Sequence, residues 1–139
     1  MLLIPVKVAP SAIHNLGVFA VSPIRKGTIV WQFDPGIDHR HPVAWLSRQP
    51  DHVRRHALTY GVLNLAGTHY NLPGDHTMFV NHSESPNLAP DDDVQLNGDG
   101  VVVAARDIAA GEEITIHYGE IDGADRDRLR RGQPLFPQD

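Results

Sequence analysis

The 139-residue chain contains no cysteine. Neither a disulfide nor a thiolate-ligated zinc site can therefore form, and a cysteine nucleophile is excluded. No serine stands in a Gly-x-Ser-x-Gly elbow either, so that signature of serine hydrolases is also missing. Because there is no cysteine, its usage says nothing about the redox compartment.

Long apolar runs are missing as well. The apolar opening at residues 1–4 is interrupted by Pro5 and Lys7, which makes it too short for the core of a signal peptide. No run approaches the roughly 20 apolar residues that a helix needs to span a bilayer. We therefore expect a soluble, cytoplasmic protein without a membrane partner, and the sequence leaves open a secreted or host-nuclear role.

Basic residues are outnumbered, with 12 Lys and Arg against 17 Asp and Glu, which gives a formal net charge of -5 with neutral histidines. Nucleic-acid binding normally needs a basic surface, so we expect no nucleic-acid partner. A basic protein or peptide is the more natural partner. The run Asp91, Asp92 and Asp93 could attract such a peptide, although runs of this kind are more often simply solvated loops.

The chain does have many turn-forming residues, 12 glycines and 11 prolines, within a hydrophobic content of 41%. This composition favours short strands joined by turns over a helix bundle, and the length fits one domain. We therefore expect a mainly β fold with short helices. The pattern Ala-x-x-x-Ile-x-x-Gly occurs at residues 20–27 and again at residues 104–111, which predicts two similar strand-turn-strand units.

Hydrophobic periodicity predicts the elements along the chain. Strands are expected at residues 2–8, 18–21, 28–33, 62–65, 69–72 and 101–105, and helices at residues 42–48, 51–60 and 122–131. In the third strand, alternation places Ile29, Trp31 and Phe33 on one face. Glycine-containing turns are expected at residues 25–27 and 97–100.

Two polar stretches cannot be explained by packing alone. Residues 81–87 read Asn-His-Ser-Glu-Ser-Pro-Asn, which is poor material for a helix or a central strand and indicates a binding loop. Residues 11–20 read Ser-Ala-Ile-His-Asn-Leu-Gly-Val-Phe-Ala, which indicates a glycine-containing turn that leads into a strand. As an isolated motif, such a turn is more often just a hairpin.

A third stretch, residues 111–119, reads Gly-Glu-Glu-Ile-Thr-Ile-His-Tyr-Gly. It predicts a turn followed by a strand with Ile114, Ile116 and Tyr118 on one face. The phenol of Tyr118 would then end an apolar row.

Together these three motifs, in this order, resemble the SET-domain protein lysine methyltransferases. The resemblance covers residues 4–119 and is closest to the minimal stand-alone SET proteins of bacteria and large viruses. It implies a SET-type fold of several small curved sheets with a knot-like C-terminal crossing. The implied division is a SET domain at residues 1–121 and a C-terminal extension at residues 122–139. The implied activity is S-adenosylmethionine-dependent methylation of a lysine side-chain amine in a protein substrate.

The resemblance also implies a set of cofactor contacts: His14, Asn15, Leu16, Gly17, Asn81, His82 and Phe136. Asn15 replaces the first glycine of the family's usual Gly-x-Gly turn. Asparagine tolerates left-handed backbone conformations better than other non-glycine residues, so we expect the turn to form. Phe136 would close over either the adenine or the lysine channel. Ser83 and Asn87 are expected to fix the loop by bonding to nearby backbone.

By the same resemblance, Tyr118 is the catalytic tyrosine. Its hydroxyl would orient the reacting amine rather than remove a proton, because a phenol with a pKa near 10 is a weak base at neutral pH. Tyr60 is expected to line the substrate channel, with Tyr70 as its competitor. Ile116 stands where the family often has an aromatic residue, which predicts products beyond monomethyl-lysine. An ordinary core isoleucine is an equally open interpretation.

Two rival interpretations remain. Four of the nine histidines, namely His39, His41, His52 and His56, invite a metal site. The pattern lacks the glutamate of His-Glu-x-x-His proteases, so a solvated face is favoured and no metal is predicted. The second rival is a catalytically inactive SET-like module that binds peptide or cofactor, which the change at Asn15 keeps open. By analogy with viral relatives only, a homodimer is one further expectation.

Overall fold

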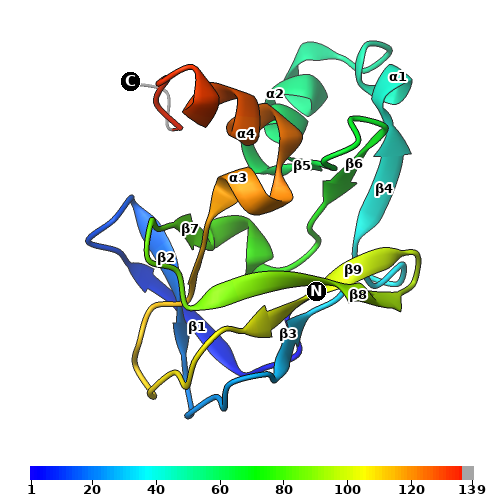
Figure 1. Cartoon of the computed structure of the whole chain (residues 1–139). Helices are drawn as coiled ribbons and strands as arrows, with labels where there is room; N and C mark the ends of the chain where they lie inside the picture. The colour runs from blue at the N-terminus through cyan, green and yellow to red at the C-terminus, as the bar shows by residue number, and fades with distance from the viewer. Residues whose placement is uncertain (136–139) are drawn as a thin grey trace. The chain divides into compact units, whose positions relative to one another are not determined.

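The computed structural model describes residues 1–135. Within them the chain forms short strands and short helices (Figure 1), which confirms the mainly β class. The strands are β1 (Val6–Pro10), β2 (Leu16–Ala20), β3 (Ile29–Trp31), β4 (His39–Pro42), β5 (Val62–Leu63), β6 (His69–Leu72), β7 (Asn81–His82), β8 (Leu88–Leu96), β9 (Asp99–Ala104) and β10 (Thr115–Ile116). The helices are α1 (Val43–Leu46), α2 (Asp51–Tyr60), the 3-10 helix η1 (His76–Phe79), α3 (Tyr118–Ile121) and α4 (Gly123–Arg130).

These elements form two compact units. Residues 1–39 and 73–117 make up the first unit, and residues 40–72 with the chain from residue 118 onward make up the second. The first unit contains the sheets β1-β2, β10-β7 and β3-β9-β8, and the sheet β4-β6-β5 belongs to the second. Several small sheets therefore take the place of one large sheet, as the sequence predicted.

The two copies of the Ala-x-x-x-Ile-x-x-Gly pattern meet at their isoleucines in the first unit. Ile24 and Ile108 form an antiparallel bridge in which each amide donates to the carbonyl of the other residue at 2.8 Å. Both side chains are buried, so apolar burial as well as hydrogen bonding stabilises the contact between the two copies. The two predicted strand-turn-strand units are thus confirmed, and they pack on each other.

The alanines and glycines of the two copies are joined reciprocally. The Gly27 amide donates to the Ala104 carbonyl at 2.8 Å, and the Gly111 amide donates to the Ala20 carbonyl at 2.7 Å. The two glycines have φ values of +85° and +82°, which residues with a side chain rarely adopt. Glycine is therefore required at the same point of both copies.

Strand β3 differs from its prediction. Val30 and Phe33 are buried, whereas Ile29 and Trp31, which were expected on the same face as Phe33, are only half-buried. The cause is a bulge, because Ile29 pairs with Val103 and Trp31 pairs with the adjacent Val102 of β9. The extra residue on β3 shifts the period-2 alternation by one position.

The β8–β9 hairpin turns where the sequence predicted. Asn97 and Gly98 have φ values of +53° and +83°, the pair of positive angles that a type I′ turn requires. The sequence did not predict β4, η1, β8 and α3. Helix η1 is capped by Asp75, whose carboxylate accepts a hydrogen bond from the Thr77 amide at 3.1 Å.

In the second unit, α2 has the predicted bounds and is followed by its C-cap Gly61, whose amide donates to the Ala57 carbonyl at 2.8 Å. A Cβ at Gly61 would lie 2.4 Å from that same oxygen, so only glycine fits. No helix among the described residues combines the length and apolar character needed to cross a membrane.

Helix α4 is capped by a buried carboxylate. Asp122 accepts hydrogen bonds from the amides of Ala124 at 2.8 Å and Asp125 at 3.1 Å, and from the Leu63 amide at 3.2 Å. Burial raises the pKa of the Asp122 carboxyl above its usual range. The folded chain therefore binds this proton more tightly than the unfolded chain does.

This shift predicts a pH dependence of stability. A group whose pKa is raised on folding stabilises the folded state. This stabilisation is fully present below the pKa of the group in the unfolded chain, about 3.9, and is lost as the pH rises through its pKa in the folded chain. We expect the free energy of unfolding of the wild type, relative to Asp122→Asn, to decrease as the pH rises above about 4. Urea denaturation at stepped pH measures this difference, with the exposed Asp127→Asn as matched control. A difference that stays constant with pH would contradict the prediction.

Candidate active site

Asn81 lies at the centre of the polar network of the first unit, and its side chain is buried. Its amide nitrogen lies 2.9 Å from the Leu16 carbonyl and 2.9 Å from Oε1 of Glu113. The same nitrogen lies 3.2 Å from the His14 carbonyl oxygen and 3.2 Å from the Ser11 hydroxyl. The Asn81 side chain therefore holds the glycine-containing turn of the first motif against the loop of the second.

The turn itself has the predicted conformation. Asn15 has a φ of +39°, so asparagine adopts the left-handed region where the family's usual residue is glycine. The Ser11 amide donates to the Asn15 carbonyl at 2.9 Å, and the Ser11 hydroxyl accepts from the Ile13 amide at 2.9 Å. The replacement at Asn15 is thus compatible with a closed, hydrogen-bonded turn.

Gly17 is required for a reason that the sequence did not reveal. A Cβ built on it would lie 2.2 Å from Oε1 of Glu113 and 3.1 Å from the Ser11 Cβ. The Ser11 hydroxyl lies 2.9 Å from both oxygens of the same carboxylate. Glycine at this position therefore lets the Glu113 carboxylate approach the turn that it holds.

The second and third motifs meet through a short parallel pairing. Strand β7 runs beside β10, with Asn81 opposite Thr115 and His82 opposite Ile116. The Ser83 amide then donates to the Ile116 carbonyl at 3.1 Å. The cofactor residues predicted on the loop therefore lie next to the residues that precede Tyr118 in the chain.

Two further loop residues have the structural roles predicted for them. Asn87 is buried, and its side chain donates to the Glu113 carbonyl and accepts from the Thr115 amide, both at 2.8 Å. The Ser83 hydroxyl accepts from the Ser85 amide at 3.0 Å. Asn87 thus fixes the loop to the third motif, and Ser83 closes the turn inside the loop.

The strand predicted over the third motif is wrong in its extent. Ile114, Thr115 and Ile116 are all buried, so the expected alternation between two faces is absent. Strand β10 covers only two residues, and Tyr118 is the first residue of α3. A strand enclosed on both faces shows no period-2 pattern of exposure, which is why the pattern was misleading.

The three tyrosines considered for the catalytic and channel positions, Tyr60, Tyr70 and Tyr118, belong to the second unit and are half-buried. Tyr60 ends α2, with its ring centroid 5.1 Å from that of His56. Tyr70 lies opposite Leu63 in the β5–β6 pair. Tyr60 and Tyr70 thus remain the two candidates for one channel position.

The remaining two predicted site residues have different outcomes. Ile116 belongs to the first unit and is 4% exposed, which fits a core residue and also the wall of a narrow apolar channel. Phe136 lies outside the described residues.

A cluster that the sequence did not predict lies beside β7. It consists of His82, Glu84 and His117, and one ligand atom from each lies within 4.8 Å of the others. Nε2 of His82 is 3.1 Å from Oε1 of Glu84, and this hydrogen bond holds the pKa of the Glu84 carboxyl below its usual range. The sequence did offer a signal, because the second and third motifs each contain a histidine, His82 and His117.

The four histidines considered for a metal form no such cluster among residues 1–135. His41 stacks on Trp45, with ring centroids 3.9 Å apart. The residues that do come together as possible metal ligands are therefore His82, Glu84 and His117, and none of these four histidines.

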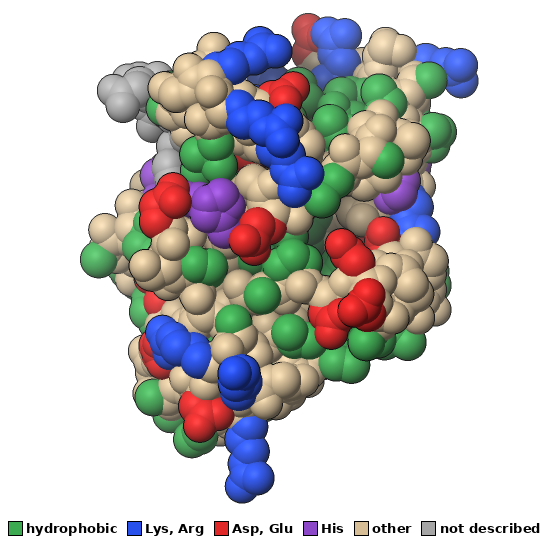
Figure 2. Space-filling model, viewed as in Figure 1, with side chains coloured by type: hydrophobic (Ala, Val, Ile, Leu, Met, Phe, Trp, Pro, Cys, Tyr) green, Lys and Arg blue, Asp and Glu red, His purple; other side chains and the backbone are tan. Residues whose placement is uncertain are grey.

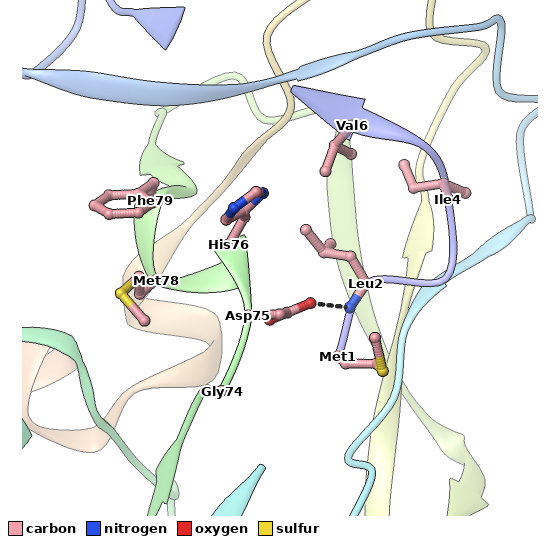
Figure 3. A pocket seen from close by; sticks show the side chains of 9 residues that line it. All are labelled: Met1, Leu2, Ile4, Val6, Gly74, Asp75, His76, Met78 and Phe79. Atoms are coloured by element: carbon pink, nitrogen blue, oxygen red, sulfur yellow. Dashed lines mark hydrogen bonds between the residues drawn. The ribbon is translucent and has the colours of Figure 1, made fainter. Parts of the chain in front are cut away.

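A pocket of about 390 Å³ opens in the first unit between the N-terminal segment and η1 (Figure 3). Its walls are mostly apolar, and across it the Asp75 carboxylate accepts from the Leu2 amide at 2.8 Å. The lining residues are Met1, Leu2, Ile4, Val6, Gly74, Asp75, His76, Met78 and Phe79. None of the predicted cofactor residues is among them.

The contact between Gly17 and Glu113 makes a testable prediction. We expect Gly17→Ala to destabilise the fold by about 1–3 kcal/mol, because the new Cβ displaces the carboxylate. In a Glu113→Ala background the same change should cost much less, since the obstacle is gone. Chemical denaturation of the four proteins of this cycle gives the coupling energy. Equal costs in the two backgrounds would show that the close approach does not determine the residue.

Comparison with known proteins bears on the same segments. The family model of the SET domain matches residues 15–119 of this chain. No curated protein matches the chain. Among solved structures, a candidate histone methyltransferase of Plasmodium falciparum matches with a TM-score of 0.57 and 22% identity, over 83% of this chain and 93% of that one.

Two structures of Polycomb Repressive Complex 2 also match. An apo form has a TM-score of 0.65 and 21% identity over 90% of this chain. A humanized Chaetomium thermophilum form bound to an inhibitor has a TM-score of 0.62 and 22% identity over 88% of this chain. In both cases the match covers 16% of the longer chain, so the likeness concerns the fold of one domain. By the family match over residues 15–119 and by its fold, the chain belongs to the SET-domain family.

Proposed function

We propose that the chain is a protein lysine N-methyltransferase that uses S-adenosylmethionine. The observation that carries the proposal is the hydrogen bonding of Asn81 to the turn at residues 11–17. This bonding joins the first two family motifs in one unit, where the third is paired to the second. Membership of the SET-domain family supports the same activity.

The residues of the first unit fit a cationic methyl donor. The Glu113 carboxylate lies beneath the turn at residues 11–17 and supplies negative charge there. Asn81 and the backbone of His82 supply polar groups from β7, and Gly17 keeps side-chain bulk out of the turn. When bound, the donor supplies a methyl group whose carbon–sulfur bond breaks as the nitrogen–carbon bond forms, so that the electron pair leaves with a neutral thioether.

The protein's own part is to orient and desolvate the amine. A lysine must reach the site uncharged although its ordinary pKa is near 10.4, and an apolar channel lowers that value by desolvation. We assign Tyr118 to polar contact with the amine and the channel walls to Ile116 and Tyr60, with Tyr70 as the competitor of Tyr60. Aromatic walls also attract the methylated cation that forms.

The substrate class follows from charge. Asp92 and Asp93 are exposed on β8, and acidic side chains gather over the β8–β9 hairpin (Figure 2). Neither carboxylate forms an ion pair with a described residue. An acidic surface of this kind attracts lysine- and arginine-rich segments, so we propose a basic protein or peptide as substrate.

Replacement of Tyr118 tests the assignment of the catalytic residue. We expect Tyr118→Phe to leave the affinity for S-adenosylmethionine within about threefold, while the transfer rate falls at least about tenfold. Calorimetry measures the affinity, and tritiated methyl transfer into a basic peptide pool or a cell lysate measures the rate. Ser22→Ala, which removes an exposed hydroxyl from a residue without an assigned role in the site, is the control and should retain most of the activity.

Equal activity of Tyr118→Phe and the wild type would remove this residue from the mechanism. Cofactor binding by a wild-type protein that transfers nothing would instead support the rival function, a SET-like binding module.

The identity of residue 116 predicts the number of methyl groups added. Isoleucine cannot hold a water through a hydroxyl, which leaves room for a partly methylated amine. We expect mass spectrometry of a labelled substrate at exhaustive turnover to show dimethyl- or trimethyl-lysine. Ile116→Tyr should shift the products toward monomethyl-lysine, and Ile116→Leu is the control of similar volume. A single added methyl group with the wild-type enzyme would contradict this expectation.

A further inference from the structure

The imidazoles of His82 and His117 and the carboxylate of Glu84 have no part in the proposed methyl transfer, which uses the backbone of His82. All three side chains belong to the first unit. Together they offer two nitrogen ligands and one oxygen ligand within 4.8 Å of one another. Imidazole and carboxylate are the commonest nitrogen and oxygen ligands of zinc in proteins that do not use cysteine.

The distances suit one bound ion. Nε2 of His82 lies 3.1 Å from Oε1 of Glu84, and Nε2 of His117 lies 3.4 Å from Oε2 of Glu84. A tetrahedral zinc ion with bonds of about 2.1 Å separates neighbouring ligand atoms by about 3.4 Å. By contrast, the second distance is well beyond the roughly 2.8 Å of a charge-assisted hydrogen bond. Two of the three separations are thus close to those around a zinc ion, and the third, which lies within 4.8 Å, would adjust on binding.

The backbone brings these ligands together rigidly. Because His82 lies opposite Ile116 in the parallel β7–β10 pair, His117 follows one residue later beside the loop. The two imidazole centroids are 4.8 Å apart in an edge-on arrangement. The turn that carries Glu84 is closed by the bond between the Ser85 amide and the Ser83 hydroxyl.

The two histidines are fixed while the carboxylate can adjust. The side chains of His82 and His117 are 11% and 26% exposed, against 76% for Glu84. Nδ1 of His117 is buried without a hydrogen-bond partner among the described residues, so Glu84 is the polar group that orients this ring. An exposed carboxylate can swing to complete a coordination sphere at little cost.

We propose that His82, Glu84 and His117 bind one divalent transition-metal ion of the zinc type, with a fourth position left to water. Magnesium and calcium prefer sites made of oxygen ligands, and two imidazoles select against them. The bound ion would link the loop at residues 81–87 to the residue that precedes Tyr118. It would therefore stabilise the folded chain, by an amount that grows with the logarithm of the free-ion concentration above the dissociation constant.

Calorimetric titration of the purified metal-free chain with zinc chloride tests the proposal. We expect one ion per chain, and Glu84→Gln and His117→Asn should each weaken binding at least about tenfold, since each removes a direct ligand. The zinc-dependent rise in the unfolding temperature should be lost in the same two variants. His52→Asn, on α2, is the matched control because it tests the helical pair formed with His56.

A second measurement is independent of the variants. Nitrogen-15 chemical shifts of the imidazoles should change on zinc addition for His82 and His117 and stay constant for the other histidines. Cobalt substitution should give the visible absorption of a low-coordinate site. Absence of binding by the wild type, or binding lost in His52→Asn and retained in both cluster variants, would overturn the proposal. Magnesium chloride should produce neither the shifts nor the stabilisation.

Discussion

The polar structure of the first unit depends on one buried side-chain amide. The side-chain nitrogen of Asn81 carries two hydrogens and lies within 3.2 Å of the Leu16 and His14 carbonyls and of the Glu113 carboxylate, which share them as acceptors. A hydrogen bond to a charged group contributes about 1.5–3 kcal/mol, so loss of the Asn81 amide would weaken the attachment of the turn to Glu113. The Asn81 side chain is therefore the point at which the turn, the loop and the third motif meet.

Glu113 is the second half of that arrangement. Its carboxylate accepts from both Ser11 and Asn81, and its carbonyl accepts from Asn87. The first two family motifs therefore each contribute hydrogen-bond partners to one residue of the third. The close approach of the carboxylate is possible only because Gly17 lacks a Cβ. Gly17, Asn81 and Glu113 are far apart in sequence, but each of them limits which residue can stand at the positions of the others.

Local signals were sufficient for some elements. Helix α2 lies between Pro50 and Gly61, and the β8–β9 turn needs the two positive φ angles that Asn97 and Gly98 adopt readily. The repeat at residues 20–27 and 104–111 also reported a real structural relation, because its isoleucines pair with each other. In these cases a short stretch of sequence contains the physical cause of its own conformation.

Other features could not be read from short stretches. The bulge in β3 arises from its register against β9, and the burial of Ile114, Thr115 and Ile116 arises from the unit around them. The role of Gly17 depends on Glu113, which lies far away in the chain. The resemblance to the family supplied the loop and turn residues, but not the side-chain contacts that join them, because those contacts are formed by the tertiary structure.

The cluster of His82, Glu84 and His117 follows from the same short pairing that positions Asn81. A parallel pair of only two residues on each strand contributes few backbone hydrogen bonds, so side chains at its ends must fix its register. Asn87 does so at one end through the Thr115 amide, and the three cluster residues lie at the other. An ion held by the cluster would therefore act on the register of the two strands that carry the Asn-His-Ser loop and precede Tyr118. Any coupling between metal and methyl transfer would have to pass through this pairing.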